Sequence, residues 1–229
     1  MKDPDHDLLH GPSIARRVGA LARRVRAYVG LGANLGDAAG TLAAAVHALA
    51  ALPGARLRGV SRLYATAPVG VPDQPEFRNA VVALDVPGGP DRATGATALL
   101  VALKSIERAF GRSGGARWGP RELDLDLLAF GRAQVQVERP PEGVSLDAGH
   151  ARRLLEVPHP EAHERLFVLA PLADLAPGLV PPVWGETVGS AARRRTRVDG
   201  ASAARAVARW DPVAGSWARI DVEPSDGDS

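Results

Sequence analysis

The sequence contains no cysteine, and this absence removes several classes of site at once. Disulfide bonds, thiolate-ligated zinc, iron–sulfur clusters and cysteine nucleophiles all depend on that residue. The sequence also lacks any run of about 18 consecutive apolar residues, so we expect no membrane-spanning helix. No G-x-x-x-x-G-K-[ST] motif occurs, which excludes a P-loop nucleotide site.

Lysine is almost as scarce, because only Lys2 and Lys104 occur among 28 basic residues. Against 26 acidic residues the formal net charge is +2, which is too small for a general polyanion binder. An RNA-binding sheet would also need aromatic residues in an RNP-type run, and none is present. We therefore expect neither a nucleic-acid partner nor a membrane partner.

The length of 229 residues suits one large domain with extensions. Residues 1–24 are polar and then arginine-rich, and we expect a poorly ordered extension there. That segment lacks the apolar core and cleavage site of a secretory signal, which favours a cytoplasmic protein. Residues 25–184 are expected to form the main domain and residues 185–229 a C-terminal extension. Three residues of that end are interpreted as packing residues, namely Trp184, Trp210 and Trp217.

Apolar periodicity predicts an alternation of strands and helices in the main domain. Helices are expected from Asp37 to Pro53 and over 91–110, the latter ending at Gly111. Strands are expected at 26–31, 57–64, 77–86 and 123–130. Their order predicts the α+β class, a ferredoxin-like antiparallel sheet with helices packed on both faces in three layers. Residues 131–156 are interpreted as a variable excursion rich in proline, glycine and charge.

The strongest chemical signal is a pair of carboxylates, Asp124 and Asp126, on the last of these strands. Side chains two residues apart in a strand point to the same face, about 7 Å apart along the chain. Two carboxylates so placed can converge on one or two hard cations. Without cysteine, and with scattered histidines, magnesium shared with substrate phosphates fits better than zinc. An exposed acidic strand edge is the alternative for an isolated pair of this kind.

An arginine-rich segment precedes the carboxylate pair. Guanidinium groups bind phosphate oxygens through two parallel hydrogen bonds, so they complement magnesium on a polyphosphate. A solvated charge run would not explain the interruption of these charges by Trp118-Gly-Pro, which adds bulk and fixes the backbone. The arginines that we expect to contact phosphates are Arg112, Arg117 and Arg121, with Arg165 further along the chain.

Two histidines four residues apart, His159 and His163, would share a metal if they lay on one helix. Pro158 and Pro160 argue against a regular helix at that point. We interpret His159 as a phosphate or nucleotide contact and His163 as a structural or surface residue. Local hydrogen bonding is the alternative for both.

A planar heterocycle could be bound by Phe77, Asn79 and Phe167. Two aromatic rings can sandwich such a ligand, and an amide can read its donor and acceptor edge. The alternative is that both phenylalanines belong to the core, where aromatic residues are usually found. The chain has only four Phe and two Tyr, so few other residues could stack on a ligand.

The segment Arg117-Trp-Gly-Pro-Arg-Glu-Leu-Asp-Leu-Asp-Leu is the most specific motif of the chain. From about Ala27 to Leu179 the sequence resembles the 6-hydroxymethyl-7,8-dihydropterin pyrophosphokinases of folate biosynthesis. Five further segments support the resemblance in the family's order, beginning at Gly32, Thr66, Asp73, Ile106 and Pro158. The resemblance implies transfer of a pyrophosphoryl group from ATP to the hydroxymethyl group of the pterin, with release of AMP.

The same resemblance implies roles for individual residues. Two magnesium ions would be held by Asp124 and Asp126, which with Arg112 and Arg121 would form the catalytic group. ATP would be handled by Glu107, Arg117, Trp118, His159 and Arg165. The pterin would lie between Phe77 and Phe167, with its edge read by Asn79 and by the backbone from Thr66 to Val69. We expect a monomer with ATP and the pterin as its small-molecule partners.

The sequence also departs from the family's pattern. Ala33 stands where a serine is usual, and Gly114 stands where the arginine loop often carries a second arginine. These departures keep open an alternative, a catalytically weak nucleotide-binding relative on the same ferredoxin-like fold. Retention of both Asp124 and Asp126 favours the enzyme.

Overall fold

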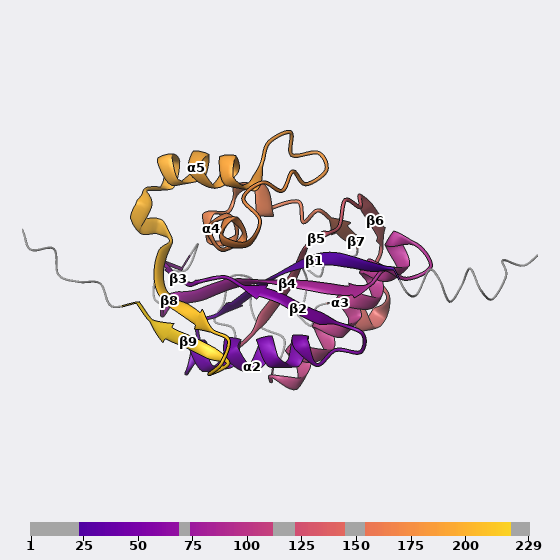
Figure 1. The fold of residues 1–229 in the computed structure, drawn as a ribbon, viewed down its shortest axis with the longest axis horizontal. Coiled ribbons are helices and arrows are strands. Elements are labelled where there is room, and N and C mark those ends of the chain that lie inside the picture. Colours follow the sequence, from indigo (N-terminus) through magenta and orange to yellow (C-terminus); the bar gives the residue numbers. More distant parts are fainter. Residues whose placement is uncertain (1–22, 69–73, 112–121, 145–153, 221–229) are drawn as a thin grey trace, which may run out of the picture.

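One antiparallel sheet forms the centre of the computed structural model, which describes residues 23–68, 74–111, 122–144 and 154–220 (Figure 1). Its strands lie in the order β5-β1-β4-β3-β8-β9, and β2 also pairs with β4. The bounds are β1 Arg24–Ala33, β2 Arg56–Val60, β3 Leu63–Thr66, β4 Phe77–Pro87, β5 Asp124–Phe130, β8 Arg205–Asp211 and β9 Ser216–Arg219. Within the described residues, each pair of neighbouring strands in this sheet is antiparallel.

Helices cover both faces of the sheet. Figure 1 shows α2 and α3 on one face, with α4 and α5 on the other. Their bounds are α2 Ala38–Ala50, α3 Arg92–Ala109, α4 Leu166–Leu175 and α5 Val188–Asp199. The larger buried cluster joins the sheet to α2 and α3, and a smaller one lies between the sheet and α4. In the part of the chain that the structure describes, no helix is long and apolar enough to cross a membrane.

The predicted starts of both helices are confirmed by capping hydrogen bonds, whereas α2 ends at Ala50, before the predicted stop at Pro53. Asp37 caps α2 by accepting from the N–H of Gly40 at 3.0 Å. Asp91 caps α3 by accepting from the N–H of Thr94 at 2.9 Å. Gly111 follows α3 with a φ of +86°, a left-handed conformation that favours glycine. These signals are local in the sequence, which is why they could be read there.

The prediction of a single strand over 57–64 is wrong, because β2 and β3 are separated at Ser61 and Arg62. The backbone N–H of Val81 donates to the hydroxyl Oγ of Ser61 at 2.9 Å, in place of a ladder carbonyl. The backbone N–H of Arg62 donates to Asp174 of α4 at 3.1 Å. Side chains therefore take over backbone hydrogen bonds and interrupt the ladder, which alternation of apolar residues does not reveal.

The excursion after β5 contains a second, two-stranded sheet. Its strands β6 Val135–Glu138 and β7 Leu154–Val157 are antiparallel. A short 3-10 turn follows each strand, η1 Pro141–Gly143 after β6 and η2 Ala162–Glu164 after β7. The second turn leads directly into α4, so it sets where that helix begins.

The C-terminal residues pack on the main domain. The helix α5 contacts α4 through Leu169, Ala191 and Ala192, and β8 adds a strand to the main sheet beside β3. Trp210 and Trp217 pack edge to face, with ring centroids 4.7 Å apart, and Trp184 lies against His163 at 4.9 Å. A third turn, η3 Ala201–Ala203, links α5 to β8. The extension expected at residues 1–24 lies almost wholly outside the described residues, and Arg24 already belongs to β1.

Candidate active site

The carboxylate pair lies on β5 as the alternation predicts. Leu123, Leu125 and Leu127 are buried toward the core, with exposures of 0%, 0% and 3%. Asp124 and Asp126 are only partly buried and share the opposite face. This is the face that α4 covers elsewhere in the sheet. The geometry meets the first requirement of a cation site, two carboxylates directed to one side.

Strand register places a glycine and an amide beside this pair. Asp124 lies opposite Gly32 of β1, and Gly32 lies opposite Asn79 of β4. Directly opposed residues of antiparallel strands project to the same face. A Cβ atom at Gly32 would lie 3.3 Å from Oδ1 of Asn79. Asp124, Gly32 and Asn79 thus form a row across three neighbouring strands. The amide oxygen of Asn79 is directed along this row toward Asp124, and Gly32 adds no side chain between them.

Asn79 is fixed by its neighbour on β3. Its Nδ2 donates to the hydroxyl Oγ1 of Thr66 at 2.8 Å, and both residues are 6% exposed. Thr66 in turn lies opposite Phe77, so all three residues share one face of the sheet. Phe77 is partly exposed and lies outside the buried core. The structure therefore brings together Thr66, Phe77 and Asn79 from the predicted pterin group.

A buried asparagine, Asn34, anchors the segment that leads into Phe77. It is 3% exposed, and its Nδ2 donates to Oε1 of Gln74 at 3.2 Å and to the carbonyl of Pro75 at 3.4 Å. Asn34 follows β1, and Gln74 and Pro75 precede β4. The bonds tie the ends of two neighbouring strands together on the side where Gly32 and Phe77 lie.

A buried ion pair holds the backbone between the two aspartates. Nζ of Lys104 lies 2.6 Å from Oε1 of Glu107, and their side chains are 5% and 2% exposed. The same Oε1 accepts from the N–H of Leu125 at 2.7 Å, and Nζ donates to the carbonyl of Leu125 at 3.1 Å. Both polar groups of Leu125 are therefore bound from α3. The pair fixes the one residue that separates Asp124 from Asp126.

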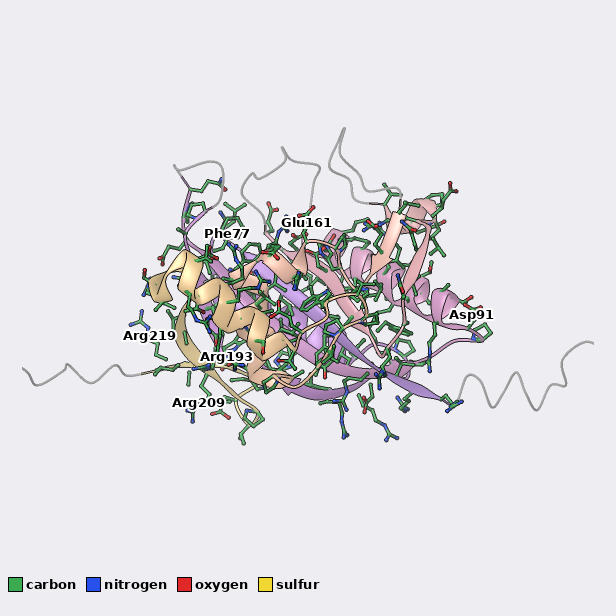
Figure 2. The ribbon with its side chains drawn as sticks, turned by 90° about the horizontal axis from the view of Figure 1, so that it is seen from above. Phe77, Asp91, Glu161, Arg193, Arg209 and Arg219 are labelled. Carbon is green, nitrogen blue, oxygen red and sulfur yellow. The ribbon has the colours of Figure 1, made fainter. Side chains whose placement is uncertain are left out.

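The beginning of α4 contributes a second aromatic residue. Phe167 lies in the first turn and is partly exposed, so it does not belong to the buried core. The guanidinium carbon of Arg165 lies 5.6 Å from the ring centroid of Phe167, and Arg165 also forms an ion pair with Glu161. Figure 2 shows Phe77 and Glu161 toward the same edge of the molecule. Arg165 and Phe167 are thus brought together, as the predicted phosphate and pterin contacts.

The other end of α4 is held to β3 by a polar cluster. The hydroxyl of Tyr64 donates to Oδ1 of Asp174 at 3.0 Å, and Arg62 donates to both oxygens of the same carboxylate. Burial and the adjacent Asp174 raise the pKa of Tyr64 above its usual range. The hydrogen bond with Asp174 raises the pKa of Arg62. The helix that carries Phe167 is therefore fixed at its far end as well.

The two histidines have separate surroundings. The backbone N–H of His159 donates to the carbonyl of Leu128 on β5 at 2.9 Å, and its Nδ1 accepts from the N–H of Glu161 at 3.3 Å. His163 instead lies 3.0 Å from Oε1 of Glu186 and packs on Trp184. These contacts agree with a structural role for His163. His159 lies next to the carboxylate strand, where a nucleotide contact stays a prediction.

Several predicted site residues lie outside the described residues, namely Val69, Arg112, Arg117, Trp118 and Arg121. Within the described ranges, no group of three or more His, Asp or Glu side chains is placed to hold a metal ion. Asp124 and Asp126 still fit magnesium, because that ion is commonly bound by one or two carboxylates together with substrate phosphates. Glu107 is placed behind β5, where it contacts Leu125.

Sequence reasoning missed the roles of Lys104 and of the glycines on β1. One signal for Lys104 was available, since it is one of only two lysines and lies three residues before Glu107 on a helix. In the sequence, Gly32 stands out only as the start of a segment that supports the family resemblance, and no local pattern marks Gly30. Gly30 lies opposite Asp126, and a Cβ atom there would approach the side chain of Leu128 to 3.4 Å. The role of these two glycines depends on which strands pair with β1.

Comparison with known proteins gives consistent matches. The family model of 7,8-dihydro-6-hydroxymethylpterin-pyrophosphokinase (HPPK) matches residues 28–177. The 2-amino-4-hydroxy-6-hydroxymethyldihydropteridine pyrophosphokinase of Methylorubrum extorquens is 46% identical over 166 residues, covering 72% of this chain and 90% of that protein. The enzyme of the same name from Pseudomonas aeruginosa is 43% identical over 157 residues, covering 69% and 84%.

Solved structures show the same fold at low sequence identity. A Plasmodium falciparum HPPK-DHPS triple mutant superposes with a TM-score of 0.62 at 13% identity, covering 86% of this chain and 49% of that one. An HPPK-DHPS complex with substrates gives the same TM-score and coverage. The chain spans about half the length of these structures, and the likeness concerns the fold alone.

Proposed function

The chain belongs to the 7,8-dihydro-6-hydroxymethylpterin-pyrophosphokinase family, and from this we propose that it transfers pyrophosphate from ATP to 6-hydroxymethyl-7,8-dihydropterin in folate biosynthesis. The hydroxymethyl oxygen attacks the β-phosphorus and loses its proton. The bond from the β-phosphorus to the oxygen that bridges it to the α-phosphorus breaks. AMP leaves with that oxygen, and the pterin diphosphate is the other product. The observation that carries the proposal is the row that joins Asp124, Gly32 and Asn79 across neighbouring strands.

We propose that Asp124 and Asp126 hold two magnesium ions. Both carboxylates share one face of β5, and the strand between them is fixed by Lys104 and Glu107. When bound, such ions neutralise the charge of the triphosphate and stabilise the attacking and leaving oxygens. The contribution of the protein is to keep the two carboxylates at a constant spacing.

The pterin is proposed to bind beside this row, between Phe77 and Phe167. Both rings are partly exposed, which leaves surface for stacking. Asn79 would read the donor and acceptor edge with Oδ1 and the second N–H of its amide, because Thr66 takes only one of the two Nδ2 hydrogens. Thr66 supports the amide, and the backbone as far as Val69 would complete the recognition of the edge.

ATP is proposed to bind on the β5 side through arginines and a histidine. Arg165 lies over Phe167, and His159 is bonded to the backbone of β5. Arg112 and Arg121 would offset phosphate charge during transfer, and Arg117 and Trp118 would contact the nucleotide. Glu107 is buried behind β5, so its part in ATP binding would be exerted through the position of Leu125.

The remaining features are proposals of the same kind. We class the core as a ferredoxin-like, three-layer α/β/α arrangement, since two helices lie on each face of an antiparallel sheet (Figure 1). We propose a monomer that works in the cytoplasm, where ATP is available. The substrates are small molecules, and neither nucleic acid nor a membrane is required.

The reaction can be tested by phosphorus NMR. The purified chain is mixed with ATP, magnesium chloride and the reduced pterin, and the spectrum is followed with time. We expect AMP and a pterin diphosphate to appear in equal amounts, and neither to form without the pterin. Formation of ADP would show transfer of a single phosphoryl group, and absence of turnover would favour a catalytically weak nucleotide-binding relative.

A further inference from the structure

The segment after α4 lies beyond residues 28–177, which the family model matches, yet it contacts both sides of the proposed pterin site. The first contact is made by β8. This strand pairs with β3, where Tyr64 lies opposite Ala206 and Ala65 lies opposite Arg205. The strand that ends at Thr66 is therefore held between β4 and β8, and is not an edge of the sheet.

Arg205 also reaches the residue before Phe77. Its Nη2 donates to Oε1 of Glu76 at 2.9 Å. Arg78 approaches the other oxygen of Glu76 at 3.2 Å. The hydrogen bond from Arg205 holds the pKa of Glu76 below its usual range. One strand of the extension thus supports both Thr66 and the start of β4.

The second contact is made by α5 at the turn η2. Arg194 donates through its Nη atoms to both carboxylate oxygens of Glu164, at 3.1 and 3.2 Å, and to the carbonyl of His163 at 3.3 Å. Its Nε donates to Glu186 at 3.1 Å. Arg165 follows Glu164 directly, and Phe167 lies two residues further on. The guanidinium group of Arg194 therefore fixes the turn from which both residues extend.

The extension is itself attached to the main domain at its far end. The indole Nε1 of Trp217 donates to the carbonyl of Ser61 at 3.0 Å. Nε2 of His47 on α2 lies 2.8 Å from the carbonyl of Gly215. These bonds attach the hairpin of β8 and β9 to the β2–β3 break and to α2, so Arg205 is presented from a rigid element.

We propose that residues 186–211 brace the two walls of the pterin site, with Arg205 positioning Phe77 and Arg194 positioning Phe167 and Arg165. This inference rests on the proposed function, because it assumes that these residues contact the substrates. Neither arginine touches a substrate in this account. Each acts through the residue that it holds, so its loss should change substrate affinity more than the rate of the bound complex.

The two arginines predict different kinetic signatures. Arg205→Ala should raise the KM for the pterin about threefold and leave the KM for ATP unchanged, because it supports only the Phe77 wall. Arg194→Ala should raise both KM values, about fivefold, because Arg165 and Phe167 follow the same turn. The value of kcat should stay within about twofold in both variants. Arg205→Lys, which keeps the charge opposite Glu76, should restore most of the pterin affinity.

The chain offers matched controls on the same elements, and Figure 2 labels both. Arg193 is adjacent to Arg194 and donates to Ser190 of its own helix at 3.2 Å. Arg209 lies four residues after Arg205 on β8 and is exposed. Arg193→Ala and Arg209→Ala should leave both KM values unchanged. Glu76→Gln combined with Arg205→Ala should be no worse than Arg205→Ala alone, since the bond between the two residues is already lost and the glutamine oxygen can still accept from Arg78.

The outcomes separate the brace from the function on which it rests. Absence of AMP formation by the unmodified chain would overturn the proposed function. Normal turnover, with unchanged KM values and a lower melting temperature in Arg194→Ala and Arg205→Ala, would overturn the brace alone and leave a purely structural extension. Equal effects in the control variants would also overturn it, because general loss of surface charge would then be the cause.

Discussion

The two halves of the proposed site are held by different kinds of ion pair, one buried and one exposed to solvent. On the carboxylate side, Lys104 and Glu107 are 5% and 2% exposed and bind the backbone of β5. On the side proposed to bind the pterin, Arg194 and Glu164 are 36% and 55% exposed and form an ion pair at the turn before α4. The first pair lies inside the segment that the family model matches, and Arg194 lies beyond it.

This difference in burial determines what each contact contributes. Removal of one buried partner leaves an uncompensated charge away from water, which is strongly destabilising. Removal of an exposed partner lets water take its place, and most such pairs contribute little. The spacing of the two carboxylates is therefore fixed rigidly, whereas the position of the proposed pterin walls is open to modest adjustment.

The largest effect is expected at the carboxylates themselves. Asp124→Asn or Asp126→Asn removes one negative charge from a site proposed to hold two dications against a triphosphate. Each variant should lower turnover on the order of hundredfold or more, with an unchanged circular dichroism spectrum. The measurement is the rate of AMP formation at saturating magnesium. Near-normal turnover in both variants would remove the metal role from β5.

The next largest effect is expected at the buried pair. Lys104→Met should lower the free energy of unfolding by about 3–5 kcal/mol, because Glu107 would be left buried and unpaired. Chemical denaturation with urea measures it. The double variant Lys104→Met with Glu107→Gln should recover most of the loss, since the amide oxygen can still accept from Leu125. No recovery in the double variant would show that the ion pair is not what holds the strand.

A smaller effect is expected at the pterin wall. Phe167→Ala should weaken pterin binding by roughly 1–3 kcal/mol if ring stacking on nucleobases is a fair guide. Because Phe167 is partly exposed, the melting temperature should change little. Calorimetric titration of the pterin, in the presence of a non-hydrolysable ATP analogue, measures the affinity. A large loss of stability with unchanged affinity would place this ring in the core.

The smallest effect is a pH dependence of the exposed brace. The hydrogen bond from Arg194 lowers the pKa of Glu164, and bonds with His163 and Arg194 lower that of Glu186 against the effect of desolvation. A carboxyl group whose pKa is lower in the folded than in the unfolded chain stabilises the fold at pH values above its unfolded pKa, which is about 4.3 for glutamate. This contribution is lost as the pH falls through the folded pKa. At pH 7, Arg194→Ala should melt roughly 2–4 °C below the unmodified chain. This difference in melting temperature should become smaller below about pH 4. A difference in melting temperature that stays constant with pH would exclude these carboxylates as its cause.

Features that depend on nearby residues were predictable from the sequence. Asp37, Asp91 and Gly111 mark helix ends because each acts within one turn of its own position. The common face of Asp124 and Asp126 follows from the two-residue period of a strand. The family resemblance added the expected ligands of these residues, and the family match and the named relatives support that resemblance.

Features that depend on the packing of distant segments were not predictable. The row of Asp124, Gly32 and Asn79 exists only because β1 pairs with β4 and β5 in one register. Arg205 and Glu76 are 129 residues apart, and no local pattern connects them. The break between β2 and β3 depends on Asp174, which lies 112 residues after Arg62. In each case tertiary contacts decide the outcome.

Separate positioning of the two halves of the proposed site is tested most directly by a comparison of steady-state kinetics. The rates of AMP formation would be measured for the unmodified chain, for Arg205→Ala, and for the double variant of Lys104 and Glu107. We predict that the double variant lowers kcat with an unchanged KM for the pterin. Arg205→Ala should raise that KM with an unchanged kcat. If both variants changed the same parameter, either kcat or the KM for the pterin, separate positioning of the two halves would be contradicted.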